Sequence, residues 1–374
     1  MRSHPRSTAA TLALCLGASQ AALLVLSPIL VALASDLGVS TATAGQLRTI
    51  SGLAAGLTAL SAGVVASRIG LRELLLVGLA LVAGGCAVSA ASPHFALLAA
   101  AQVLVGAGVG ISYSAAVAAA AEWSSAADRS RVLAAALLGP PLAWVLGMPL
   151  AGLAGEVTWR LSWVVVPLAT SAVGLVALTR QASTPPAAER ADLRSVFAQP
   201  GVLGWSLGEL LAYSAWVGTL VFVGALFVES YGSSVAATGL ILGAGALVYI
   251  PGNLLFRRWV DSQPRRLLVG LALASAVTVA VLGSVRRDVW TSLAIFGLLA
   301  FLAGGRTLAG SARGLDIAPA VRLGVTGVRT AALQFGSFLG GAIGGVALTA
   351  GGFTALGLSF AVLYVFAALP HIRL

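Results

Sequence analysis

Four ionisable residues inside or near long apolar stretches are the candidates for chemistry in this 374-residue chain. Arg48, Glu209 and Arg306 stand within such stretches, and Arg329 stands near the end of another. A charge at the centre of a bilayer costs about 2.5–3.5 kcal/mol on insertion scales, so each needs a partner, water or a route to the interface. Counted at 1.5 Å per helical residue, Glu209 and Arg306 lie about 10 and 14 Å from their helix ends, which predicts that they pair.

The other two arginines have different expected positions. Arg48 follows the start of its apolar stretch by a few residues, so we expect its long side chain to snorkel to the interface, with binding of an anionic solute as the alternative. Arg329 lies close to the other interface and is expected in an interfacial or gate ion pair. Glu209 is the one deeply placed carboxylate, so a proton that drives any gradient-dependent process would be carried there. The alternative is that Glu209 and Arg306 form a fixed structural ion pair.

The composition requires a lipid environment for most of the chain. Hydrophobic residues make up 59% and charged residues 9%, with a mean hydropathy of +0.98, whereas globular domains carry about 25% charged residues. The net charge of +10 does not indicate nucleic-acid binding, because the arginines lie in short gaps between apolar runs. Soluble enzymes, coiled coils and disordered proteins are therefore excluded.

The sequence contains no residue pattern typical of a catalytic, metal or cofactor site. The two cysteines and three histidines lack the spacing of a metal site or a disulfide framework, so neither a cofactor nor a metal is expected. All 22 basic residues are Arg, so no nucleotide-binding loop with its Lys exists. We find no cluster of side chains suited to an integral-membrane enzyme, and the complete preference for Arg indicates a G+C-rich, bacterial genome.

The apolar runs predict twelve membrane-spanning helices, because crossing the hydrocarbon core takes roughly 20 apolar residues. The expected fold class is an all-α polytopic membrane protein with two six-helix bundles, 1–178 and 201–374, joined by a cytoplasmic linker, 179–200. The first run is too long for a secretory signal and is expected to stay as a helix. The predicted spans are 10–33, 44–66, 74–91, 95–121, 132–153, 161–178, 202–228, 235–256, 267–285, 289–315, 323–349 and 353–369.

Orientation and internal repetition follow from the same pattern. Fifteen arginines fall on one side of the predicted spans and three on the other, which places both termini in the cytoplasm. The seven letters of 75–81 recur at 267–273, a shift of 192 residues, and Gly139 and Gly147 match Gly336 and Gly344 at the same spacing. Six-helix repeats are typical of secondary transporters, whose substrate site lies between the halves.

A motif between the second and third spans carries a resemblance to a known family. The segment Gly63-Val64-Val65-Ala66-Ser67-Arg68-Ile69-Gly70-Leu71-Arg72 resembles the Gly-x-x-x-Asp-Arg-x-Gly-Arg-Arg signature of the major facilitator superfamily. Ser67 replaces the acid and Leu71 a basic residue, so the inner lock is expected to be weaker. The resemblance implies an inner gate of Gly63, Ser67, Arg68, Gly70 and Arg72, with Glu122 as the partner of the arginines.

A second resemblance concerns direction of transport. Gly139, Gly147, Pro149 and Gly152 are similar to the Gly- and Pro-rich antiporter motif of the superfamily's drug-export branch, in reduced form. The alternative is that these residues only allow close helix packing. The Arg that this branch often carries in the fourth helix is replaced by Gln102.

Polar and aromatic residues on the spans expected to line the cavity suit a weakly polar organic solute better than a sugar. The expected cavity residues are Gln20, Gln102, Ser112, Tyr113, Glu209, Tyr213, Trp216 and Arg306, although Gln20, Ser112 and Tyr113 could instead only bond neighbouring helices.

The resemblance implies a monomeric secondary transporter in a bacterial cytoplasmic membrane. We expect proton-coupled export of a drug or metabolite by alternating access. Uptake or exchange of an organic anion is the alternative, and a membrane receptor or assembly factor is the non-transport alternative.

Overall fold

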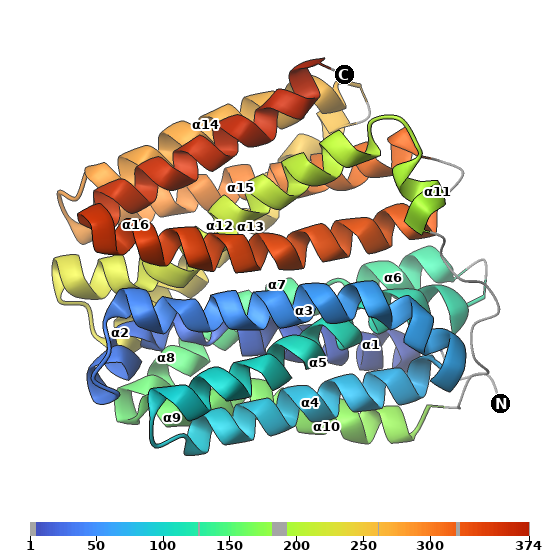
Figure 1. Ribbon diagram of the computed structural model, residues 1–374, viewed down its shortest axis with the longest axis horizontal. Coiled ribbons are helices and arrows are strands. Elements are labelled where there is room, and N and C mark those ends of the chain that lie inside the picture. The colour runs from blue at the N-terminus through green and yellow to red at the C-terminus, as the bar shows by residue number, and fades with distance from the viewer. Residues whose placement is uncertain (1–4, 126–127, 182–192, 261, 319–321, 374) are drawn as a thin grey trace.

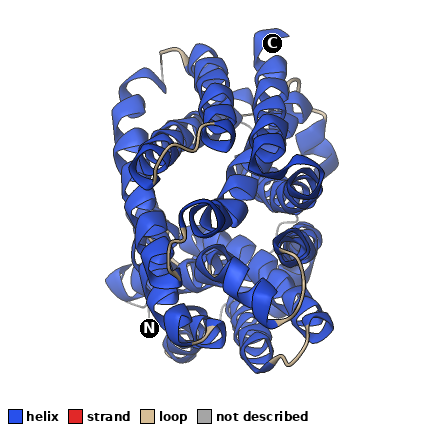
Figure 2. Ribbon diagram, turned by 90° about the vertical axis from the view of Figure 1, so that its left-hand side faces the viewer, coloured by secondary structure: helices blue, strands red, loops and turns tan. Residues whose placement is uncertain are grey.

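The computed structural model describes residues 5–125, 128–181, 193–260, 262–318 and 322–373, and the regular structure in these ranges is helical (Figure 2). The helices up to residue 181 are α1 Pro5–Leu24, α2 Leu26–Asp36, α3 Thr41–Ile69, α4 Leu71–Ala91, α5 Phe95–Glu122, α6 Arg129–Ala136, α7 Gly139–Leu142, the π-helix η1 Ala143–Gly147, α8 Met148–Val157, α9 Trp159–Trp163, the π-helix η2 Val164–Leu168 and α10 Ala169–Thr179. The later helices are α11 Leu193–Phe197, α12 Val202–Tyr231, α13 Val235–Val260, α14 Pro264–Ser284, α15 Val289–Ile317 and α16 Arg322–Arg373.

The helical class agrees with the sequence, because a lipid-exposed backbone must satisfy its polar groups within the segment. Ten stretches of the described residues are long and apolar enough to cross a membrane. Predicted span 44–66 falls in α3, which is not among the ten, and predicted spans 323–349 and 353–369 both fall in α16. The backbone of α16 is non-helical at Gly351 and Gly352. The all-α membrane class is confirmed, and the count of twelve stays a prediction.

Prolines mark where the helices are interrupted. The break between α1 and α2 comes at Val25, shortly before Pro28, whose nitrogen has no hydrogen to donate to the preceding turn. Pro149 is the second residue after η1, and Pro167 lies within η2. A proline cannot donate the regular helical bond, and a wider π turn accommodates that loss.

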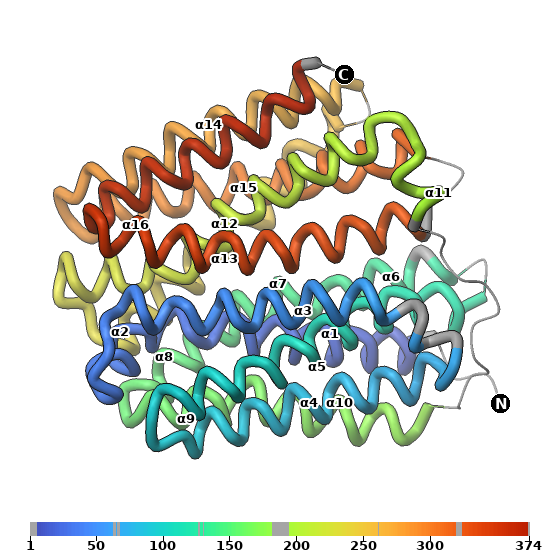
Figure 3. The backbone as a smooth tube through the Cα atoms, in the orientation of Figure 1, coloured from blue at the N-terminus to red at the C-terminus, as the bar shows by residue number. Residues whose placement is uncertain are grey.

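The two halves of the chain occupy separate sides of the molecule (Figure 1). Helices α1 to α10, here the first half, lie together, and α11 to α16, the second half, lie together above them in this view. The backbone tube shows the ends of the chain and α11 near one end of the long helices, here the terminal end (Figure 3). The connections α2–α3 and α8–α9 lie at the opposite end.

Contacts between the halves tie them together at the opposite end. Helix α3 packs against α16, α2 against α12, and α8 against α13. The Thr41 hydroxyl donates to Glu229 Oε1 at 2.7 Å, and the Ala236 amide donates to Glu156 Oε2 at 2.8 Å. Since each bond joins one half to the other near the ends of α3, α8, α12 and α13, the opposite end is closed in this structure.

Candidate functional site

A buried ion cluster joins three helices of the second half. Glu209, in α12, is fully buried, and its Oε1 lies 2.9 Å from Arg306 Nη1 in α15. Its Oε2 accepts a hydrogen bond of 2.9 Å from Arg329 Nε in α16. Arg306 also donates to the Gly208 carbonyl at 2.9 Å, and Arg329 donates to the Thr307 carbonyl at 3.2 Å. One carboxylate and two guanidinium groups give the cluster a net charge of +1.

Small residues of α15 make room for this cluster. A Cβ added at Gly310 would lie 2.6 Å from the Glu209 carboxyl carbon, so only glycine fits there. The Trp205 indole donates to the Gly310 carbonyl at 2.9 Å and holds α12 beside α15. Glu209 is thus enclosed by helices of the second half.

The sequence predicts part of this arrangement. The pairing of Glu209 with Arg306, expected from their similar depth, is present. Arg329, expected in an interfacial or gate ion pair, does form an ion pair, and its partner is the buried Glu209. Position 329 lies about two turns inside α16, roughly 10 Å at the helical rise, and its long side chain reaches the buried acid.

Arg48 points into the protein. Its side chain is 1% exposed, so the expected snorkelling is wrong. Its Nη1 donates to the Leu23 carbonyl at 3.3 Å, near the break between α1 and α2, and its Nη2 donates to Ser337 Oγ of α16 at 3.2 Å. In the ranges that the structure describes, no carboxylate lies within ion-pair distance of Arg48. Arg48 is therefore a buried cation between the halves whose partners are neutral.

Aromatic rings connect the halves midway along the helices. Trp144 of η1 lies 5.8 Å from Trp216 of α12 and 5.3 Å from Tyr249 of α13, measured between ring centroids. Trp216 also lies 6.4 Å from Phe296 of α15. The indole nitrogens of both tryptophans are buried without a hydrogen-bond partner. Buried polar groups are normally paired, so these two N–H groups are free to bind a polar atom between the halves.

Three members of this aromatic cluster, Trp144, Tyr249 and Phe296, are missing from the residues expected in the cavity. A usable signal existed for two of them. Trp144 stands between the paired prolines 140–141 and Gly147, and Tyr249 stands two residues before Pro251. Aromatic residues beside helix-distorting prolines are candidates for a site between transporter halves.

Two other expected cavity residues belong to the interior of the first half. Gln102 is 1% exposed and donates to Ser89 of α4 at 3.0 Å. Ser112 is fully buried and faces Gly78 of α4. Both expectations are wrong, because both side chains lie between α4 and α5. Gln102 forms a hydrogen bond there, whereas the Ser112 hydroxyl is buried there without a hydrogen-bond partner. Tyr113 packs on an apolar cluster of the first half, whereas Gln20 borders a pocket between the halves.

Comparison with known proteins decides the family. The model of the Major Facilitator Superfamily matches residues 12–208, just over half of the chain. The "Transcription regulatory protein OpdE" of Pseudomonas aeruginosa is 30% identical over 360 residues, which are 91% of this chain and 86% of that protein. The chain belongs to the major facilitator superfamily.

The gate motif of this superfamily member is only partly involved in contacts. Gly70 joins α3 to α4 with a φ of +84°, a conformation that glycine adopts without strain. Arg72 donates to the carbonyls of Leu178 and Thr179 at 3.0 and 3.4 Å, which holds the end of α10. Arg68 is exposed.

The expected acidic partner of the motif is not used. Glu122 is exposed and forms no ion pair within the described ranges, so its expected pairing is wrong. Arg72 instead lies 3.4 Å from its neighbour Glu73. For Gly63 and Ser67 only the helical backbone is described, so the roles predicted for their side chains lie outside the described residues.

The second motif brings helices into close contact. A Cβ at Gly152 of α8 would lie 2.7 Å from the Gly239 Cα of α13, and Pro149 lies against Gly243. Gly139 lies against the backbone of α1, whereas a Cβ at Gly147 would meet only a Val166 methyl, at 3.3 Å. Helix packing therefore accounts for Gly139, Pro149 and Gly152.

Proposed function

We propose that this protein moves a small amphipathic organic solute across a bacterial cytoplasmic membrane by alternating access. The superfamily consists of secondary transporters that bind small solutes within a lipid bilayer and are not enzymes, and the ten candidate spans agree with a multi-pass membrane protein. The observation that carries the proposal is the aromatic cluster, because its unpaired indole N–H groups lie where the halves meet.

The proposed architecture has twelve spans in two bundles, 1–178 and 201–374, with the linker 179–200 and both termini in the cytoplasm. The ten candidate spans become twelve when α3 is added and α16 is divided at Gly351–Gly352. The position of both termini at one end of the molecule supports an even number of crossings (Figure 1). A monomer contains both bundles and is the proposed functional unit.

Proton-coupled export is the proposed mode of transport. Glu209 is the one buried acid of the described residues, and its contact with Arg329 joins α12 to α16. A relative movement of these helices would separate the pair and leave the carboxylate able to accept a proton. The segment 139–152, similar to an antiporter motif, favours the outward direction.

Transport of an organic anion is the second candidate function. Arg306 and Arg329 pair with one buried carboxylate and Arg48 pairs with none, so these four groups have a net charge of +2. A low-dielectric interior makes such an excess unfavourable, and a negatively charged solute would reduce it. Uptake or exchange of an anion therefore has an observation in its favour.

A regulatory role without transport is the third candidate, since the Pseudomonas relative is named a transcription regulatory protein. A membrane sensor could use the same sites to bind a solute and would show no flux.

Proteoliposomes with an imposed pH gradient separate these three functions. A panel of amphipathic cations, neutral aromatics and aromatic carboxylates is tested in both gradient directions. We expect flux of at least one compound above that of empty liposomes, and no flux in either direction would contradict transport.

Variants then test the coupling. Glu209→Gln should lose gradient-driven flux and keep solute exchange, whereas the exposed control Asp288→Asn should behave as wild type. Full gradient-driven flux by Glu209→Gln would remove Glu209 as the proton carrier and leave transport itself intact.

A further inference from the structure

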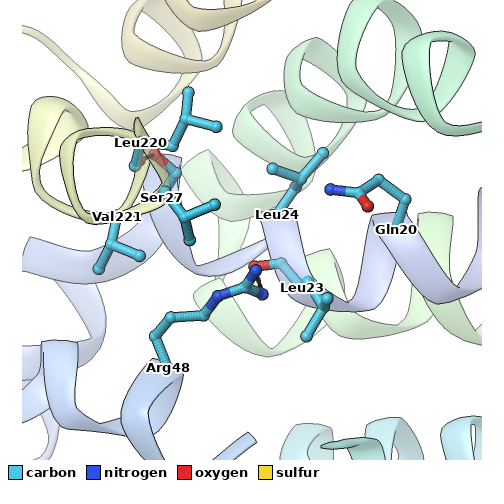
Figure 4. Close-up of a pocket in the computed structure, with 8 residues that line it drawn as sticks. Gln20, Leu23, Leu24, Ser27, Arg48, Leu220 and Val221 are labelled. Atoms are coloured by element: carbon cyan, nitrogen blue, oxygen red, sulfur yellow. Dashed lines mark hydrogen bonds between the residues drawn. The ribbon is translucent and has the colours of Figure 1, made fainter. Parts of the chain in front are cut away.

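A narrow pocket at Arg48 lies between the two halves (Figure 4). Arg48 of α3, Gln20 of α1 and Ser27 of α2 provide its polar lining. Its apolar lining consists of aliphatic side chains, among them Leu23 and, from α12, Leu220. The pocket therefore combines one cation with a hydrocarbon wall, and it has walls from both halves.

The hydrogen bonds of Arg48 leave its charge uncompensated. Its two bonds go to a carbonyl and a hydroxyl at 3.3 and 3.2 Å, near the long limit for N–H···O bonds. Its Nε is buried with no hydrogen-bond partner, and the side chain is 1% exposed. A guanidinium binds a carboxylate in a bidentate manner through paired N–H groups, so a free Nε beside Nη donors is suited to that ligand.

The two arginines of the ion cluster do not share this property. Arg306 and Arg329 both lie 2.9 Å from oxygens of Glu209. Burying a charge is strongly unfavourable unless it is paired, and the described residues supply no acid for Arg48. A ligand carboxylate would supply the counter-charge that Arg48 lacks.

We infer that the Arg48 pocket binds the carboxylate of an aliphatic or aromatic monocarboxylate, with Arg48 as the group that selects an anionic solute. This inference rests on the proposed function, in which a solute enters between the halves. In this structure, with the opposite end closed, the pocket has room for about one water molecule, so the ligand would enter when the halves separate. The hydrocarbon lining would then hold the apolar part of the ligand, and Gln20 would donate a further hydrogen bond. Because Arg48 bonds Leu23 in one half and Ser337 in the other, ligand binding there also affects how the halves are joined.

Ligand binding to the 374-residue chain in detergent tests the inference without a transport measurement. Hexanoate and benzoate are titrated by calorimetry and by thermal unfolding, with hexanamide as the uncharged match and chloride as the inorganic anion. We expect both carboxylates to bind and raise the unfolding temperature and hexanamide to bind at least about tenfold more weakly, since bonds to charged groups are the stronger ones. Equal binding of hexanamide, or no binding of either carboxylate, would overturn the inference.

Variants of Arg48 and of its partner Ser337 test whether Arg48 binds the carboxylate. Arg48→Gln should weaken hexanoate binding at least about tenfold. Arg48→Lys keeps the charge but loses the paired N–H groups, so it should weaken binding by less than Arg48→Gln does. Arg287→Gln, the same change at an exposed arginine, should have no effect. Ser337→Asp places a carboxylate beside Arg48 and should raise thermal stability while abolishing hexanoate binding. Its uncharged match, Ser337→Asn, should still bind.

Two further results would contradict carboxylate binding at Arg48. If Ser337→Asp bound hexanoate as wild type does, Arg48 would not be the site. If chloride alone bound and Arg48→Gln abolished it, the pocket would take an inorganic anion and the inference would be wrong. Binding of hexanoate by a protein that moves no compound in liposomes would instead contradict the proposed function alone.

Discussion

The three residues of the ion cluster differ in how far they are removed from water. Side-chain exposure is 0% for Glu209, 7% for Arg306 and 18% for Arg329. Removing the acid leaves two guanidinium groups unpaired, whereas removing either arginine leaves the acid with one partner. The acid therefore holds the cluster together.

We predict an order of destabilisation from this geometry. Glu209→Gln should lower the free energy of unfolding by about 3–5 kcal/mol, the usual effect of breaking a buried pair. Arg306→Gln should follow and Arg329→Gln should have the smallest effect, because Arg329 is the more exposed partner. Thermal unfolding in one detergent gives the order, with Asp288→Asn as the control. A larger effect of Arg329→Gln than of Glu209→Gln would contradict this description of the cluster.

Sequence reasoning works for Glu209 and fails for Arg48 for one physical reason. Depth along a helix follows from counting residues, and this was enough to pair Glu209 with Arg306. The direction of a side chain around the helix axis depends on which neighbours supply hydrogen bonds. Arg48 turns inward toward the Leu23 carbonyl and Ser337, and neither contact could be read from the spacing of α3.

At the scale of helices, the contact of α8 with α13 depends on residues without side chains. Gly152 and Gly239 face each other, and each is close to the backbone of the other helix. The apolar runs located these helices well, while the π-helices η1 and η2 were not predicted. A proline in a run shows that a helical bond is missing, but not how the chain accommodates the loss.

Gly152→Ala should force α8 and α13 apart. The added Cβ would lie 2.7 Å from Gly239 Cα, so the backbones must shift. We expect a loss of about 1–3 kcal/mol in stability, typical of overpacking, measured by thermal unfolding. Gly147→Ala is the matched control in the same motif, because its Cβ meets only a flexible methyl group at 3.3 Å. Equal effects of the two variants would show that the motif does not act through this contact.

For the whole molecule, the central claim is that its two halves move relative to each other around a site between them. The structure shows the opposite end tied by the bonds of Thr41 to Glu229 and of Ala236 to Glu156. Ser67 stands where the family signature has an acid, so the terminal end lacks that negative charge. We therefore expect the two bonds at the opposite end to be the stronger connection between the halves. Alternating access requires that these two bonds can break and the opposite end can open.

Distances between spin labels measure the relative movement of the two halves most directly. Both samples use a variant that lacks Cys15 and Cys86. The first sample carries labels at Ser40 and Ser234, across the opposite end. The second sample carries labels at Ser125 and Arg257, toward the terminal end. All four positions are exposed. Pulsed electron paramagnetic resonance in lipid nanodiscs is recorded at neutral and acidic pH, with and without hexanoate. We predict two populations at each end, with one end opening as the other closes. A single unchanged distance at both ends, or both ends opening together, would contradict transport by alternating access.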